Sequence, residues 1–182
     1  MMARPSLHLM GSRLRRSRAR KTVAAMVAGL GLIGFSALAS PTPLLVWNAS
    51  ASAPIGLYGL GLGAVHSGDF VAVRLPKMVA ALADQRGYLP RNVPLVKRIA
   101  ALPGQHVCAF NDVIITGGEI VARRVPTDPQ SRTLPWWNEC RPLRRDEVFL
   151  INGEAAGSFD SRYFGPVPTQ NVIGRLVPLW TE

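Results

Sequence analysis

The stretch LVKRIAALPG, residues 95–104, sets one lysine into an apolar run that ends at a Pro-Gly turn. Its β-branched and aliphatic side chains favour a strand. Alternate side chains of a strand share a face, so Lys97 shares a face with Leu95 and Ile99, while Arg98 points the other way. The stretch is therefore predicted to form a strand that holds one amine among apolar side chains.

Similar short segments lie on both sides of this strand, separated by Gly, Pro or Asn. Further strands are predicted at residues 69–74, 106–110, 113–116, 147–151 and 172–178. Residues 76–87 instead have helical spacing and end at a glycine, which predicts a short helix or a mobile insertion. Residues 123–145 have no clear period and are predicted to form an irregular excursion. The pattern indicates a mainly β fold.

The positive charge of the chain is concentrated at one end. The 182 residues include 21 basic and 11 acidic ones, for a net charge of +10. Seven basic residues and no acidic one lie in residues 1–21, so the rest carries 14 basic residues against 11 acidic ones. A DNA-binding domain spreads its basic residues over the surface that contacts the nucleic acid. No nucleic-acid partner is therefore predicted.

An uncharged run, TVAAMVAGLGLIGFSALAS at residues 22–40, follows this basic block. About 20 residues of helix span a bilayer core, and arginines before such a run keep their side in the cytoplasm. We therefore predict a cytoplasmic segment at residues 1–21, a transmembrane anchor at 22–40 and a periplasmic domain at 41–182. A cleaved signal peptide is an alternative, because residues 37–39, ALA, fit a cleavage site. A buried helix of a soluble domain is another.

Two cysteines, Cys108 and Cys140, lack the CxxC spacing of a zinc or redox site. In an oxidising compartment such a pair is expected to form a disulfide. It would close a loop of about 30 residues and stabilise the fold by about 3–4 kcal/mol in the loop-entropy account. Two free, buried cysteines are the alternative.

Motifs of several enzyme classes are missing from the sequence. HExxH, CxxC, a P-loop, a dinucleotide fingerprint and GxSxG do not occur. The three histidines, His8, His66 and His106, offer no Ser-His-Asp arrangement. Any catalysis is therefore expected to depend on neither histidine nor a metal, and no cofactor is predicted.

Two boxes hold side chains suited to covalent catalysis. In NASASAPIGLY, residues 48–58, an extended backbone would put Ser50 and Ser52 on one face, with small neighbours that leave room for a substrate backbone. In the stretch around Lys97, burial would lower the lysine pKa, and a neutral lysine is a general base that arginine cannot replace. A plain Ser-Ala linker and a lysine whose ammonium reaches water are the simpler explanations.

The third box is SFDSRYFGPVP, residues 158–168. Asp160 and Arg162 would form a charge-assisted pair that braces a loop. Ser158 is suited to a hydrogen bond with a lysine amine. An ordinary β-turn with a surface ion pair is the simpler explanation.

Taken together and in this order, the three boxes resemble the signal peptidase I family, and more closely its conjugative-transfer branch, the TraF pilin-processing peptidases. The resemblance covers about residues 22–180. It implies an antiparallel β domain tethered to a membrane, preceded by one transmembrane helix. It also implies a serine–lysine dyad, a preference for small residues before the scissile bond and no cofactor.

The resemblance assigns a role to each polar side chain of the boxes. Ser52 matches the nucleophile, Lys97 the general base, Ser50 an oxyanion-hole hydroxyl, Ser158 the serine that orients the lysine, and Asp160 with Arg162 a structural pair. The proline after the nucleophile comes at the second position rather than the third, which leaves Ser50 open as the nucleophile, although Ser52 is favoured. The turn before Ser158, INGEAAG, also lacks the family's Asp- and Asn-rich pattern.

The resemblance further implies a membrane-anchored serine endopeptidase that processes a conjugative pilin precursor for a type IV secretion system. In some relatives the product is cyclised. The expected partners are the pilin precursor, other proteins of the conjugation apparatus and inner-membrane lipid. The expected location is the bacterial inner membrane with the domain in the periplasm, or the free periplasm if the N-terminal segment is cleaved. The alternatives are a general signal peptidase and a non-catalytic assembly factor.

Overall fold

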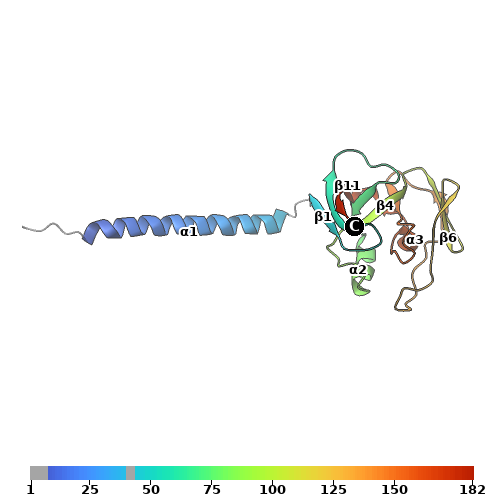
Figure 1. Ribbon diagram of the computed structural model, residues 1–182, viewed down its shortest axis with the longest axis horizontal. Helices are drawn as coiled ribbons and strands as arrows, with labels where there is room; N and C mark the ends of the chain where they lie inside the picture. The colour runs from blue at the N-terminus through green and yellow to red at the C-terminus, as the bar shows by residue number, and fades with distance from the viewer. Residues whose placement is uncertain (1–7, 40–43) are drawn as a thin grey trace, which may run out of the picture. The chain divides into compact units, whose positions relative to one another are not determined.

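The computed structural model describes residues 8–39 and 44–182. The chain divides after residue 42 into two units, which are described separately. The first contains one helix, α1 (His8–Ala39), shown in Figure 1. None of the helices in the described residues is both long and apolar enough to cross a membrane. The anchor expected at residues 22–40 therefore stays a prediction, and Ser40 lies outside the described residues, as do residues 1–7 of the basic segment.

The second unit is mainly β, as predicted. Its elements are β1 (Leu45–Asn48), β2 (Gly56–Gly61), β3 (Phe70–Val73), α2 (Lys77–Gln85), β4 (Leu95–Ala101), β5 (His106–Phe110), β6 (Val113–Thr116), β7 (Glu119–Arg123), β8 (Cys140–Pro142), β9 (Glu147–Leu150), α3 (Ser161–Phe164), β10 (Val167–Pro168), the 3₁₀ turn η1 (Thr169–Asn171) and β11 (Val172–Thr181).

The strands form two antiparallel sheets. The larger has the order β1-β2-β11-β3-β4-β9-β10, and the smaller has the order β7-β6-β5-β8. In Figure 1 the labels β1, β11 and β4 mark the larger sheet and β6 marks the smaller one. Strand β4, predicted at residues 95–100, ends at Ala101 and leads into the predicted Pro-Gly turn, where the Gln105 amide donates to the Leu102 carbonyl and Gly104 has a φ of 83°. A glycine at the third position of such a turn supplies this positive φ without steric cost.

Three sequence expectations need correction. Residues 49–55 form a turn, so Ser50 and Ser52 do not share the face of a strand. The excursion at residues 123–145 contains strand β8 and a bridge between Thr127 and Thr133. The strand β2 was not predicted, because its sequence GLYGLG has no β-branched residue. It forms because it pairs with β1 on one side and β11 on the other, so tertiary pairing outweighs local propensity.

The centre of the larger sheet is buried on both faces. Val71, Ala72 and Val73 of β3 are all fully buried, and they contribute to apolar clusters on opposite faces. Strand β4 pairs with β3 in a register that places Lys97 opposite Val71. A side chain at this position of β4 is therefore shielded from water.

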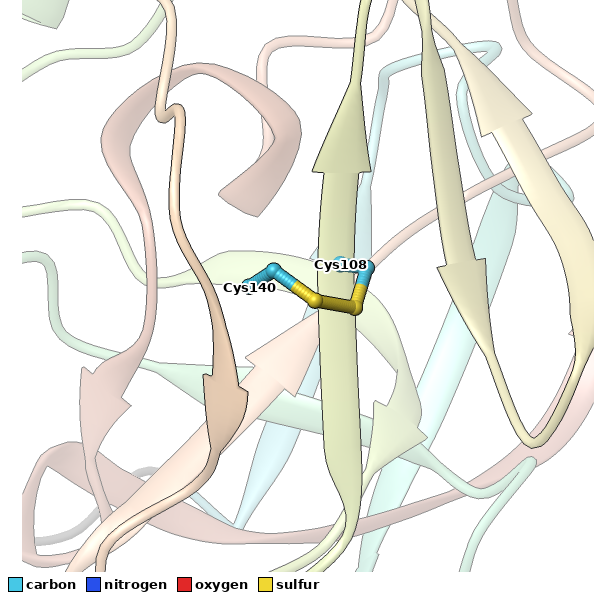
Figure 2. The surroundings of a disulfide bond; sticks show 2 residues. All are labelled: Cys108 and Cys140. Carbon is cyan, nitrogen blue, oxygen red and sulfur yellow. A yellow bond between two sulfur atoms is a disulfide. The ribbon is translucent and has the colours of Figure 1, made fainter.

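The two cysteines lie on neighbouring strands of the smaller sheet. Cys108 of β5 pairs with Cys140 of β8 in the sheet register. A disulfide bond joins them across a sequence separation of 32 residues, as Figure 2 shows. The bond ties β8, and with it the end of the excursion, to the hairpin of β5 and β6.

Replacing both cysteines, as Cys108→Ala with Cys140→Ala, is expected to lower the free energy of unfolding by about 3–4 kcal/mol, because the unfolded chain loses its cross-link. Chemical denaturation of the oxidised protein and the double variant measures this difference. The wild-type protein in reductant is the matched control and should unfold like the variant. Equal stability of all three samples would contradict the expectation.

Candidate active site

Lys97 is hydrogen-bonded to a serine of the first box (residues 48–58) and to a serine of the third box (residues 158–168). Its Nζ atom lies 2.9 Å from Oγ of Ser52 and 2.7 Å from Oγ of Ser158. Only 2% of the Lys97 residue surface is exposed, and Ser158 is buried at 4%. The simpler explanation, an ammonium that reaches water, therefore does not describe this lysine.

Burial also changes the acidity of the Lys97 amine. Desolvation disfavours the charged form and lowers the pKa of Lys97 from 10.5 to about 8, while the nearby Asp160 charge opposes the shift and the Arg162 charge adds to it. A substantial fraction of Lys97 is therefore neutral near physiological pH. A neutral amine has a lone pair that accepts a proton from a hydroxyl within hydrogen-bond distance.

The loop that carries Ser52 is held by buried polar groups beneath it. The Asn48 side chain donates hydrogen bonds to the carbonyls of Ser50, Ala53 and Pro54, at 2.9, 3.1 and 3.0 Å, and its own oxygen accepts from the Ser50 amide. The Tyr58 hydroxyl donates to the Pro54 carbonyl at 2.7 Å. These bonds fix the turn between β1 and β2, so Ser52 is presented by a loop that is rigidly supported.

Ser50 lies next to Ser52 but is not a hydrogen-bond partner of the lysine. The two hydroxyl oxygens are 3.0 Å apart, and the Ser52 amide donates a hydrogen bond to Oγ of Ser50 at 3.4 Å. Among the described residues, the hydrogen bonds of the Lys97 amine go to Ser52 and Ser158. The Ser52 amide and the Ser50 hydroxyl therefore lie next to each other beside the Ser52 oxygen.

Asp160 and Arg162 form a fully buried ion pair rather than a surface one. Two hydrogen bonds join them, from Nε at 2.7 Å and from Nη2 at 2.8 Å, and neither side chain is exposed. Asp160 is the N-cap residue of α3, and its side chain accepts a hydrogen bond from the Arg162 amide. The pair therefore lies at the first turn of a helix. Arg162 also donates to the Asn152 and Arg123 carbonyls. The pair thus ties the loop before Ser158 to strand β7.

Three supporting residues were not assigned a role from the sequence. Asn48 and Tyr58 hold the serine loop, and Asn152 joins the third box to β4, accepting from the Arg98 amide and donating to the Val96 carbonyl. An asparagine next to a serine-rich turn is a known signal for side-chain bonds to the backbone. Nothing in the local sequence of Tyr58 or Asn152 indicates their distant partners.

A cavity of about 710 Å³ opens beside the three serines and Lys97. Its walls include Val93, Leu95, Val96, Leu134 and Phe159, so they are largely apolar. One wall is formed by residues of the segment between α2 and β4, and another by residues of the 123–145 excursion. The Tyr88 hydroxyl donates to the Asp128 carboxylate and joins these walls, and Arg132 donates to the same carboxylate at 2.6 Å.

Within residues 8–39 and 44–182, no group of three or more His, Cys, Asp and Glu side chains is close enough to hold a metal ion. The chemistry that the described side chains support is nucleophilic attack by a hydroxyl, with an amine as the proton acceptor.

The family described as signal peptidase, peptidase S26, matches residues 17–180. The conjugal transfer protein TraF of Agrobacterium fabrum is 33% identical over 166 residues, which cover 85% of this chain and 92% of that protein. The plasmid transfer protein TraF of Escherichia coli is 29% identical over 144 residues, which cover 74% of this chain and 81% of that protein.

Two proteins described as signal peptidase I align with a smaller part of this chain. Signal peptidase I of Leptolyngbya laminosa is 31% identical over 90 residues, which cover 47% of this chain and 40% of that protein. The crystal structure of a signal peptidase I from Enterococcus faecalis aligns with 64% of this chain and 100% of that one, at 18% identity and a TM-score of 0.41.

Proposed function

Because the chain belongs to the signal peptidase S26 family, we propose that it is a membrane-anchored serine endopeptidase that processes a conjugative pilin precursor. In this proposal Ser52 is the nucleophile and Lys97 the general base. The observation that carries it is the buried Lys97 amine, 2.9 Å from the Ser52 hydroxyl oxygen and with a pKa of about 8.

The first chemical step follows from this contact. Neutral Lys97 takes the Ser52 hydroxyl proton while the oxygen attacks the scissile carbonyl carbon. Ser158 accepts a hydrogen bond from the amine at 2.7 Å and so directs the nitrogen lone pair toward Ser52. The Ser52 amide and the Ser50 hydroxyl donate to the oxyanion, and one such donor contributes about 3–4 kcal/mol.

The intermediate then collapses. Protonated Lys97 gives its proton to the leaving amine, the peptide C–N bond breaks and an acyl ester remains on Ser52. Water that loses a proton to Lys97 hydrolyses the ester and restores the serine hydroxyl. If an amine of the same substrate chain attacks in place of water, the product is a cyclic polypeptide.

The substrate class is proposed from the relatives. The conjugal transfer protein TraF of Agrobacterium fabrum aligns with 85% of this chain, whereas Leptolyngbya laminosa signal peptidase I aligns with only 47%. The SASAPIGLY box has the spacing of the transfer branch, with proline two residues after Ser52. We therefore place the substrate in a conjugative type IV secretion system, with other proteins of that apparatus as partners.

A location at the periplasmic side of the inner membrane completes the proposal. The uncharged run at residues 22–40 has the length of a membrane anchor. In the second unit, Trp47 and Trp180 stack with ring centroids 5.8 Å apart and are 56% and 54% exposed. They extend from strands on either side of β2, and tryptophan is enriched where proteins meet a lipid interface. These aromatic side chains support contact with lipid.

The pH dependence of activity tests the role of Lys97. Its amine is the base only when neutral, so kcat/KM is expected to rise about tenfold per pH unit well below pH 8. It should level off above the Lys97 pKa of about 8. Initial rates on a fixed peptide substrate between pH 5 and pH 10 would measure this profile. A flat profile would contradict the role of Lys97 as the base. No cleavage at any pH, together with a lysine that titrates near its ordinary pKa, would favour the non-catalytic assembly factor.

Incubation of the candidate pilin precursor with the full-length protein tests the proposed substrate. The expected product has lost one terminal segment, and mass spectrometry also detects ring closure, because a cyclic product is lighter by one further water. The Ser52→Ala variant is the matched control. If the precursor stays intact while the protein complements a strain depleted of its signal peptidase, the function is that of a general signal peptidase.

A further inference from the structure

A second cavity, of about 650 Å³, meets the first one at the Ser52 loop. Ala51, Ser52 and Ala155 line both cavities, whereas Lys97 and Ser158 line only the first. A polypeptide cut at Ser52 must extend in both directions from its scissile carbonyl. We assign the apolar cavity, whose walls include Leu95 and Val96, to the residues before the cut. The second cavity is therefore in position to receive the residues that follow it.

The second cavity differs from the first in its charge. Its walls include Arg98, Glu154 and Glu182, together with Phe70 and Asn152. Arg98 follows Lys97 directly and lies on the other face of β4, so the strand presents one cation to each side of the nucleophile. Lys97 is buried against Ser52, but Arg98 is exposed.

Arg98 is held in place without a negative partner. Its guanidinium carbon lies 3.9 Å from the centre of the Phe70 ring, and its Nη1 donates to the Gly68 carbonyl at 3.0 Å. No carboxylate among the described residues forms an ion pair with Arg98. An arginine fixed by an aromatic ring and one hydrogen bond loses little side-chain entropy when it binds an anion.

The two glutamates of this cavity, Glu154 and Glu182, are expected to affect the binding of a charged group less than Arg98 does. Both are exposed, and neither has an ion-pair partner among the described residues. Exposed, flexible carboxylates contribute little to the binding of a charged group because water screens them. Arg98, supported on Phe70, presents a preorganised fork that matches a carboxylate.

We propose that this cavity binds the segment after the scissile bond and that Arg98 selects a carboxylate within its first three residues. The proposal rests on the proposed peptidase function and adds a specificity for the leaving segment.

Quenched fluorescent peptides test this specificity with the full-length protein. Each carries alanine at the first and third positions before the scissile bond, with Asp, Asn or Lys placed in turn at the first three positions after it. At one of these positions we expect kcat/KM for Asp to exceed that for Asn by about tenfold, with Lys cleaved least well. Arg98→Gln should remove the preference for Asp over Asn, and Arg98→Lys should retain part of it.

Glu154→Gln is the matched control, because it removes a charge of the opposite sign from the same cavity. Because Glu154 is exposed, this change should increase the preference for Asp only slightly. Equal use of Asp and Asn peptides at all three positions would overturn the proposal. So would an Arg98→Gln variant that slows every peptide by the same factor, since that result indicates a bond to a main-chain carbonyl. Thermal unfolding of each variant shows whether its fold is retained.

A binding measurement separates this proposal from the peptidase function. The same peptides are titrated against the Ser52→Ala variant, which cannot form the acyl ester, and their dissociation constants are measured by fluorescence anisotropy. Tighter binding of Asp peptides that is lost with Arg98→Gln would support the site even if no peptide is cleaved. Absence of cleavage by the wild type together with this preference would count against the proposed function alone.

Discussion

The Ser52→Ala variant is expected to lose at least about 10⁴-fold in kcat on the pilin precursor, because no other hydroxyl replaces the nucleophile. Ser52 is the serine of the first box whose oxygen lies 2.9 Å from the Lys97 amine. The side chain is only partly buried, so removal of one oxygen should leave the fold and its thermal unfolding almost unchanged. Single-turnover cleavage assays measure the loss.

Ser50→Ala is the matched control for this prediction. Ser50 neighbours Ser52 at 3.0 Å and, in our proposal, only donates to the oxyanion, so its loss should cost about 10²–10³-fold. Mass spectrometry of the acyl-enzyme trapped at low pH would locate the ester. An ester on Ser50, or a larger loss with Ser50→Ala than with Ser52→Ala, would exchange the two roles.

The Lys97→Met variant is expected to lose about 10³–10⁴-fold in kcat, the range that a positioned general base contributes. Methionine keeps most of the length of the side chain but has no lone pair able to accept the proton. Lys97 is 2% exposed, so the variant no longer has to desolvate an amine, but it leaves the buried Ser158 hydroxyl without its lysine partner. These two effects oppose each other, and the unfolding temperature should change little. Cleavage rates and thermal unfolding, measured on the same samples, test both parts.

Lys97→Arg is a second variant that distinguishes charge from basicity. Arginine stays protonated in proteins, so it brings a permanent charge into the buried site and cannot act as the base. It should therefore be inactive and also less stable than the wild type. A Lys97→Arg variant that retained activity would show that the lysine contributes its charge, and the proposed mechanism would then be wrong.

Much of the fold follows from local sequence signals. The strand at 95–101 and the hairpin strands at 106–110 and 113–116 match their predictions because alternation and turn residues act over a few positions. The helix over residues 77–85 follows from its spacing in the same way. Strands β1, β2, β7, β8 and β10 were not predicted. Two of them depend on partners that are distant in sequence, because β2 pairs with β11 and β8 pairs with β5.

In the candidate site, too, some features follow from the local sequence and others depend on the tertiary structure. The sequence by itself determined which residue types are present and that Lys97 points to the opposite face from Arg98, because strand alternation is a local property. Only the tertiary structure decided that Lys97 reaches Ser52 and Ser158, which lie 45 and 61 residues away. It also decided that Asp160 and Arg162 are buried and that the Lys97 amine is shielded from water. Those features depend on sheet register and packing between distant segments, which no local pattern specifies.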